Sequence, residues 1–449
     1  MATSTSPILT TAPPVPAVPG LPIVGSLFAF RRDRLALQER AAALGPLARL
    51  QIVHIPLYVA TCADLAHQVL VEQADGFRKS TGIRYLMPIL GDGLLTSEGE
   101  THRRHRKLLA PAFAPKRLAA YGETMVAETR AQLARWQPGQ TIDLSVEMME
   151  MTLAIAGRTM FSADVRSDAT EVARGLELGM RAMVSNITSP VRLGYSWPLP
   201  RHRRMRRAVT ILDDVVYRLI AEGRRLATDR GDVLSILLQA SEDGDSLTDK
   251  QVRDEVMTLL LAGHETTANA LTWTWYELSR NPTVLARLAD ELAHVLGDRD
   301  VTVDDLPALP FNLAVIEEAM RLHPPAYMTG REAVRDFELG GYQLPAGAFV
   351  AVNIRGIHRR NDYYPDALAF RPERMLPEAK KLRPRHHYLP FGAGPRVCIG
   401  SHFALLEAQL ALATMVQHAR VRVIPAYVAP EPMVTLRPRG GMPATVERC

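Results

Sequence analysis

The spacing of apolar residues predicts helices over most of the chain. From about residue 100 to residue 290, apolar side chains recur every three or four positions, which is typical of helices with one buried face. Residues 47–61 instead alternate and are rich in Val, Ile and Leu, and short apolar runs recur at 334–339 and 349–353. The pattern predicts a mostly α protein with a smaller β portion.

One predicted helix is long enough to cross a whole domain. Thr248 and Gln251 form the pattern of a capping box at its start, and Pro282 ends it 34 residues later, a length of about 50 Å. Residues 256–262 are almost entirely apolar, but the polar block at 263–267, Gly-His-Glu-Thr-Thr, follows in the same helix. Because glycine and adjacent threonines lower helix propensity, the block indicates a functional reason for these residues.

Length and composition fit one large globular domain. The chain has 449 residues, of which 47% are hydrophobic and 22% are charged. No linker, low-complexity segment or repeat divides residues 26–449. Residues 1–25 hold five prolines between positions 13 and 22, which predicts an extended, poorly ordered N-terminal segment. We therefore expect a single domain over 26–449.

Composition also argues against several classes of protein. The first twelve residues are too short and too rich in Ser and Thr for a membrane anchor or a signal peptide. The net charge is +5, but the basic residues lack interleaved aromatics, which argues against nucleic-acid binding. Three cysteines without a C-x-x-C pair argue against zinc and disulfides, and they favour the reducing cytoplasm. The basic residues lie in three clusters, Arg103, Arg104, Arg106 and Lys107; Arg201 to Arg207; and Lys380, Lys381, Arg383 and Arg385.

One cysteine has the surroundings of a metal-binding thiolate. The run from Phe391 to Gly400 places Cys398 in a loop with two glycines and a proline, directly before an apolar helical stretch. Glycines let backbone N–H groups approach the sulfur, and Arg396 adds a nearby cation, so both favour a deprotonated thiol. The alternative is a buried structural thiol, which is common for a lone cysteine. Cys62, in an apolar strand-like run, and the terminal Cys449 lack such a context.

Several motifs together resemble those of the cytochrome P-450 family. The run Phe-Gly-x-Gly-x-Arg-x-Cys-x-Gly that contains Cys398 resembles the family's haem-binding loop, and residues 262–267 resemble its oxygen-activation motif. Glu318-x-x-Arg321, with Arg374 further on, resembles its Glu-x-x-Arg helix and distant arginine partner. The resemblance covers residues 20–440 and implies a single-domain cytochrome P-450 fold. Haem b (iron protoporphyrin IX) would lie between the long central helix and the cysteine loop.

The resemblance implies a role for each matched residue. Cys398 would be the iron ligand, Thr266 a hydrogen-bonding group at the oxygen site, and Glu265 a proton relay. Haem propionates demand cationic donors inside a protein, and the helix at 99–106 resembles the one that supplies them. The competing interpretation of the polar block is a helix kink with a satisfied threonine, whereas a zinc His-Glu-x-x-His motif fails because residue 268 is alanine. The implied cofactor-binding residues are His102, Arg106, Ala262, Gly263, Arg331, Phe391, Gly392, Arg396, Cys398 and Gly400.

The implied activity is that of a haem-thiolate monooxygenase, which inserts one atom of O2 into a lipophilic small molecule such as a terpenoid, fatty acid or steroid-like ring. No flavin or iron–sulfur segment remains, so electrons would come from a ferredoxin or flavodoxin with its NAD(P)H-dependent reductase. The first and third basic clusters would dock that partner, and we expect a monomer without a membrane anchor. The alternatives are a peroxide-driven peroxygenase or isomerase on the same fold, and a non-catalytic haem sensor or carrier. By family position the substrate pocket would comprise residues 85–95, 180–195, 257–261, 326–329 and 432–434.

Overall fold

The computed structural model describes residues 13–53, 55–187, 189, 197–226, 230–242 and 247–447. Its α-helices are α1 (Leu27–Arg32), α2 (Arg34–Ala42), α3 (Ala63–His67), α4 (Thr81–Arg84), α5 (Met87–Leu90), α6 (Gly99–Leu109), α7 (Pro115–Leu133), α8 (Leu144–Phe161), α9 (Ala169–Ile187), α10 (Pro200–Leu226), α11 (Val233–Glu242), α12 (Asp249–Arg280), α13 (Pro282–Leu296), α14 (Pro310–Leu322), α15 (Ile354–His358), α16 (Pro377–Leu382) and α17 (Ser401–His418). Its strands are β1 (Leu47–Ile52), β2 (Ile55–Ala60), β3 (Phe77–Lys79), β4 (Thr141–Asp143), β5 (Thr329–Ala333), β6 (Phe337–Leu339), β7 (Tyr342–Leu344), β8 (Phe349–Val352), β9 (Arg420–Val423), β10 (Pro430–Pro432), β11 (Leu436–Pro438) and β12 (Pro443–Glu447).

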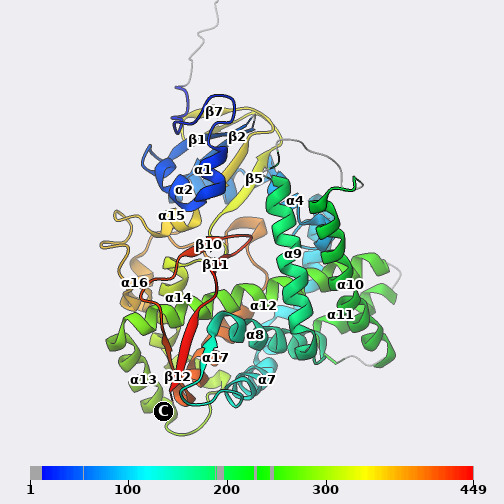
Figure 1. The fold of residues 1–449 in the computed structure, drawn as a ribbon, viewed down its shortest axis with the longest axis vertical. Coiled ribbons are helices and arrows are strands. Elements are labelled where there is room, and N and C mark those ends of the chain that lie inside the picture. Colours follow the sequence, from blue (N-terminus) through cyan, green and yellow to red (C-terminus); the bar gives the residue numbers. More distant parts are fainter. Residues whose placement is uncertain are drawn as a thin grey trace, which may run out of the picture.

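The strands gather mainly at one end of the molecule. The largest sheet has the order β1-β2-β8-β5-β3, and only the β2–β8 pair is parallel. Figure 1 shows this sheet at the upper end with α1 and α2, and the helical part below it. The predicted strands at 47–61 and 349–353 are confirmed, but the prediction was wrong at 334–336, where an exposed turn separates β5 from β6. The mostly α architecture with a small β portion is confirmed.

Helix α12 runs through the middle of the helical part (Figure 1). The capping box is present, since Thr248 accepts from the backbone of Gln251 and the Gln251 side chain accepts from the backbone of Thr248. Pro282 begins the next helix, so both predicted ends are confirmed. The helix continues through the polar block, where the Thr266 hydroxyl donates to the Ala262 carbonyl four residues earlier at 2.9 Å.

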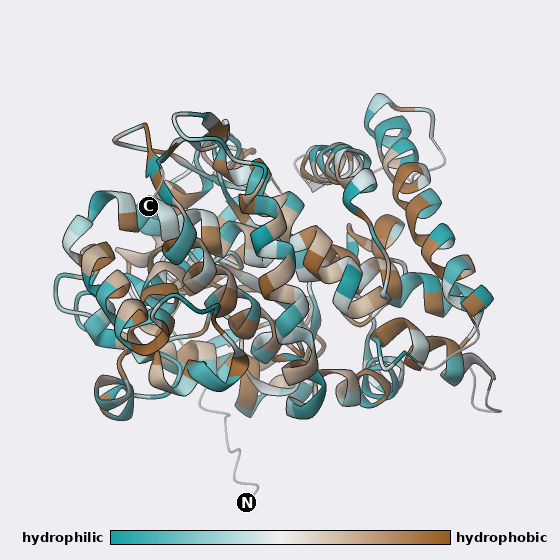
Figure 2. Ribbon diagram, turned by 90° about the horizontal axis from the view of Figure 1, so that it is seen from below, coloured by the Kyte–Doolittle hydropathy of each residue, from teal (hydrophilic) through white to brown (hydrophobic). Residues whose placement is uncertain are grey.

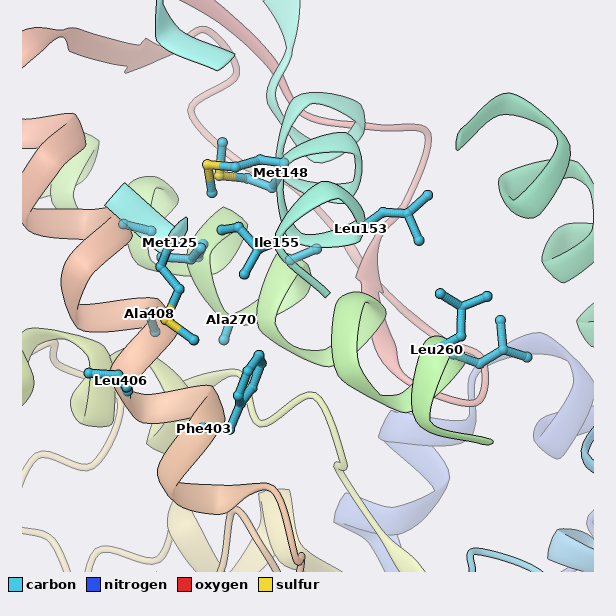
Figure 3. Close-up of a cluster of buried hydrophobic side chains, with 14 of the residues drawn as sticks. Met125, Met148, Leu153, Ile155, Leu260, Ala270, Phe403, Leu406 and Ala408 are labelled. Atoms are coloured by element: carbon cyan, nitrogen blue, oxygen red, sulfur yellow. The ribbon is translucent and has the colours of Figure 1, made fainter. Parts of the chain in front are cut away.

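The core holds α12 between other helices. Figure 3 shows apolar side chains from α7, α8, α12 and α17 meeting in one cluster, among them Met148, Ile155, Ala270 and Phe403. Each such side chain, when fully buried, contributes roughly 1.5–3 kcal/mol to stability. Figure 2 shows hydrophilic and hydrophobic residues alternating along the outer helices, as expected for helices with one buried face. The packing therefore fixes the position of α12 in the fold.

Part of the N-terminal proline-rich segment is bonded to the sheet. The Val18 N–H donates to the Arg49 carbonyl at 2.9 Å, and the Ser26 N–H donates to the Gln51 carbonyl at 2.6 Å. Gly25 has a positive φ of 59°, and a Cβ there would lie 2.1 Å from the Gln51 oxygen, so only glycine fits. The boundary at residue 26 stays a prediction, and residues 1–12 lie outside the described residues. In the described part of the chain, none of the helices combines the length and apolarity needed to cross a bilayer.

Candidate active site

Cys398 lies in a tightly turned loop between η7 (Gly394–Arg396) and α17. Its backbone N–H donates to the Phe391 carbonyl at 3.0 Å, which closes the loop. Gly392 and Gly394 both have positive φ, and a Cβ on Gly394 would lie 1.9 Å from the Leu70 carbonyl oxygen. The loop conformation and its close contact with Leu70 thus require glycine. This arrangement presents the thiol as an accessible group.

The electrostatics of Cys398 differ in one respect from the prediction. Although Cys398 keeps exposed surface, protein atoms surround most of the sulfur, and this burial raises the pKa of the thiol, while the Gly400 N–H and the Arg106 charge lower it. The prediction that Arg396 supplies the nearby cation was wrong, because the Arg396 guanidinium donates instead to the Ser97 carbonyl at 2.8 Å and to Glu98. A bound metal cation would deprotonate the thiol, because the thiolate is the form that ligates metals.

The middle of α12 has one accessible face. Between residues 252 and 278 every residue is buried except Ala262, Gly263 and Thr266. These three lie within four residues of each other, on one side of the helix. This stretch of α12 is more than seven turns long and is otherwise buried. Only two small residues and one threonine hydroxyl on it face an accessible space. This is the surface expected of a helix that faces a flat cofactor and a substrate.

Glu265 points to another part of the structure. Its side chain is buried, accepts hydrogen bonds from Arg437 at 3.0 and 2.8 Å, and also accepts from the Thr435 hydroxyl. Asn269 donates to the Thr435 hydroxyl at 3.3 Å. The carboxylate is thus held by the hairpin of β10 and β11, one residue from Thr266. No sequence motif indicated Thr435 or Arg437 as partners of Glu265.

A cation-rich cluster lies beside the cysteine loop. Four of its members were predicted. His102 and Arg106 lie on α6, Arg331 lies on β5, and Arg396 lies in the loop itself. Arg106 donates to the Val397 carbonyl at 2.8 Å, directly before the cysteine. Two members were missed, Lys79 on β3 and Glu98, whose carboxylate accepts from the Lys79 backbone N–H and from Arg396. No motif marked these two residues, because they come from the edge of the sheet and from the residue before α6.

The pKa values show that this cluster lacks negative charge. Burial, with the charges of Arg331 and Arg396, lowers the pKa of Lys79 to about 7. Burial, with Arg396, lowers the pKa of Arg331 to about 10, and the pKa of His102 falls to about 4 for similar reasons. Within the described residues, Glu98 is the one carboxylate that raises the pKa of Lys79 and of Arg331, and the charges acting on His102 are all positive groups. Two propionates would supply the missing negative charge, so the residues present fit haem.

The predicted ion network is also present. Arg321 donates to Glu318 at 2.8 Å, and both side chains are fully buried. The Arg374 guanidinium lies 3.7 Å from the same carboxylate, and Arg321 further donates to the His358 and Ala367 carbonyls. The network ties α14 to the segment that leads into the cysteine loop, which supports the interpretation that it serves folding.

Comparisons with known proteins agree with this geometry. Residues 13–441 match the protein family described as "Cytochrome P450". The chain belongs to the cytochrome P450 family. It is 38% identical over 422 residues to "Cyclooctatin synthase" of Streptomyces melanosporofaciens, with 93% of this chain and 92% of the relative covered. It is 36% identical to "Pentalenene oxygenase" of Streptomyces avermitilis, with 93% of both covered.

The solved structures agree on the fold of this P450. One match is "Crystal structure of cytochrome P450DA heme domain", with a TM-score of 0.87, 27% identity and 98% of both chains covered. A third relative, 35% identical over 94% of this chain and 93% of its own length, is "Cyclooctat-9-en-7-ol 5-monooxygenase" of S. melanosporofaciens. The protein is therefore a P450 monooxygenase with a haem-iron cofactor, and it depends on a redox partner.

The structure brings His102, Arg106, Arg331 and Arg396 of this P450 together beside the cysteine loop, while the roles of all the site residues stay predictions. Phe391, Gly392 and Gly400 form the loop around Cys398, and their contact with the cofactor stays a prediction. Of the predicted pocket segments, 85–95, 257–261, 326–329 and 432–434 are described, whereas residues 188 and 190–195 of the segment 180–195 lie outside the described residues.

Proposed function

We propose that this P450 oxidises a polycyclic terpenoid, an alkene or its alcohol, at the accessible face of α12. The observation that carries the proposal is the accessible face of α12, a patch of small residues and one hydroxyl in an otherwise buried stretch of helix, and the exposed Cys398 and the cation-rich cluster support it. Three relatives with 35–38% identity over nearly the full chain support the substrate class, since their names refer to cyclooctatin, cyclooctat-9-en-7-ol and pentalenene.

Haem b is the cofactor that these residues fit, with Cys398 on the iron and Lys79, His102, Arg106, Arg331 and Arg396 around the propionates. When bound, it supplies the activation of O2 and the transfer of one oxygen atom to the substrate. The chain supplies orientation and protons. Ala262 and Gly263 leave room beside the cofactor, and the Thr266 hydroxyl, which now donates to the Ala262 carbonyl, is placed to hold a water or a proton there.

Glu265 would deliver protons from a position set by Arg437. The carboxylate is buried and accepts from two guanidinium N–H groups and from Thr435, so it is held in one orientation. To carry a proton toward Thr266, it must exchange one of these contacts for water. The Glu265 carboxylate is thus held in one orientation by its three hydrogen bonds, and loss of one of them would free it to relay a proton.

The substrate proposal predicts a ranking of ligands. Buried Ile89, Leu94, Met180 and Met257 from the predicted pocket segments are apolar, and methionines adapt to irregular rings. In spectral titrations of the holoprotein, we expect pentalenene to bind at least about tenfold more tightly than lauric acid. With NADPH and surrogate redox partners, the product from ¹⁸O2 should gain one labelled atom. Tighter binding of lauric acid would assign a fatty-acid substrate, and product formed with peroxide alone would assign a peroxygenase.

The basic clusters contribute unequally to the proposed docking of a ferredoxin or flavodoxin. Lys380 is ion-paired with Glu317, and the Arg383 guanidinium lies 4.8 Å from the centre of the Tyr388 ring. Their predicted docking role is therefore not supported, because both face inward partners. Lys107, Lys381 and Arg385 remain exposed. The first lies on α6, which contacts the cysteine loop, and the other two precede that loop.

Charge reversal tests the proposed docking surface. We expect Lys107→Glu, Lys381→Glu and Arg385→Glu together to slow reduction by an acidic ferredoxin at least about tenfold at low salt, with haem content unchanged. The difference should shrink at physiological ionic strength, where exposed charges are screened over about 8 Å. The matched control reverses three exposed arginines of α10, Arg203, Arg204 and Arg207. Equal slowing in both triple variants, or wild-type reduction in the first, would place docking elsewhere.

A further inference from the structure

Two buried glutamate–histidine pairs bind α12 to neighbouring elements. Glu255 and His105 of α6 are joined by a 2.6 Å contact between Oε1 and Nδ1, and both side chains are almost completely buried. Glu277 and His323, the residue after α14, are joined by a 2.7 Å contact between Oε1 and Nε2. Because an ionised carboxylate only accepts hydrogen bonds, the ring nitrogen donates in both pairs. No motif of the sequence indicated either pair.

The two pairs are placed symmetrically about Thr266. Glu255 lies eleven residues before Thr266 and Glu277 lies eleven residues after it. Eleven residues are close to three full turns, so all three side chains leave α12 in nearly the same direction, about 16 Å apart along the axis. The pairs therefore fasten the helix on the same side as the accessible face, at equal distances from its centre.

The histidines belong to the elements that frame the cofactor site. His105 directly precedes Arg106, which donates to the carbonyl before Cys398. His323 follows the helix that carries Glu318 and Arg321, and its ring stacks on Trp273 of α12 with the ring centres 4.3 Å apart. One pair thus ties α12 to the cation-rich cluster, and the other ties it to the buried ion network.

These pairs are not what stability alone would favour. Among the described residues, Glu255 Oε2, His105 Nε2 and His323 Nδ1 are buried and have no hydrogen-bond partner. Unpaired buried polar atoms lower stability, and well-packed apolar side chains at the same positions would avoid that loss. A hydrogen bond has a direction, however, whereas apolar contacts permit a helix to rotate or slide. The directional hydrogen bonds of the two pairs therefore restrict the angular orientation of α12 about its own axis.

We propose that Glu255, His105, Glu277 and His323 are positioning residues that set the rotation of α12, and thereby the direction of the Thr266 hydroxyl in the active site. The inference rests on the proposed role of Thr266. Rotation matters because Thr266 stands on the helix surface, where a small turn of the axis carries its hydroxyl sideways. A misplacement of about 1 Å can cost roughly 10²-fold in rate.

Paired apolar replacements separate positioning from stability. Each double variant, His105→Phe with Glu255→Leu and His323→Phe with Glu277→Leu, removes both polar partners and leaves no single one unpaired. We expect both to keep haem and melt near the wild-type temperature, because replacing both partners of a buried pair is often neutral. Product formed per NADPH should nevertheless fall at least about fivefold, and backbone amides 262–267 should exchange hydrogen at least about tenfold faster. Lys380→Met with Glu317→Leu, which removes an ion pair between α16 and α14, is the matched control.

The outcomes distinguish this inference from the proposed role of Thr266. Wild-type coupling and wild-type exchange in both double variants would overturn it, and so would losses that follow the melting temperature or appear equally in the control. If Thr266→Ala keeps wild-type coupling, the role of Thr266 fails, while the exchange of residues 262–267 still decides whether the pairs hold the helix.

Discussion

Replacement of Cys398 by histidine is expected to abolish the thiolate spectrum and the monooxygenase activity together. In the wild-type protein the reduced carbon monoxide complex should absorb at the long wavelength characteristic of the family, and in Cys398→His it should not. The physical reason is the charge of the ligand: a thiolate pushes electron density toward the iron and favours O–O cleavage, whereas a neutral imidazole does not. Product formation should fall below detection even if haem is retained.

The control for this experiment is another cysteine of the same chain. Cys62 is buried, and burial raises the pKa of its thiol. It lies directly before α3, far from Cys398 in the sequence. Cys62→Ser should leave the spectrum unchanged. An unchanged spectrum in Cys398→His would remove the ligand assignment, and loss of the spectrum in Cys62→Ser would mean that the assay reports folding.

Thr266→Ala should separate NADPH oxidation from product formation. The hydroxyl donates only within α12, so its loss should disturb neither the fold nor substrate binding. General acid–base assistance is typically worth roughly 10²–10⁴-fold, and we therefore expect product per NADPH to fall at least about tenfold while hydrogen peroxide rises. The measurement is the ratio of product, peroxide and NADPH consumed, with the substrate-induced spectral change as a check on binding.

Two further variants make the result specific. Thr267 is the adjacent threonine, but it is buried and lies off the accessible face, so Thr267→Ala should retain coupling. Thr266→Ser keeps a hydroxyl and should restore much of it. Wild-type coupling in Thr266→Ala would mean that the threonine serves the helix, and it would favour a peroxide-driven reaction.

Features that depend on one continuous segment could be predicted from the sequence. The loop around Cys398 and the ends of α12 follow from local chemistry, namely glycine conformations, a capping box and a proline. The polar block at 262–267 stands out because it conflicts with the apolar helix around it. The same local signals correctly indicated a mostly α fold.

Features that depend on chain segments meeting in space could not be predicted. Lys79, Glu98 and Arg437 are ordinary charged residues in the sequence, and only the fold brings them to the site. The direction of a long side chain is equally hidden, which is why Arg396 was assigned to the thiol although it reaches Glu98. The ion pair of Lys380 with Glu317 was missed for the same reason, since a cluster of basic residues in the sequence does not reveal which acidic residues they contact.

The hairpin of β10 and β11 has a consequence for protein engineering. Arg437 and Thr435 hold Glu265, and the Trp273 indole donates to the Leu436 carbonyl at 2.9 Å, so the hairpin is bonded to α12 at two places. If residues 432–434 line the substrate pocket as predicted, we expect libraries that enlarge it there also to displace Glu265, the proposed proton relay. Wider substrate scope should come with wasted NADPH, unless the contacts of Arg437 are retained in every library member.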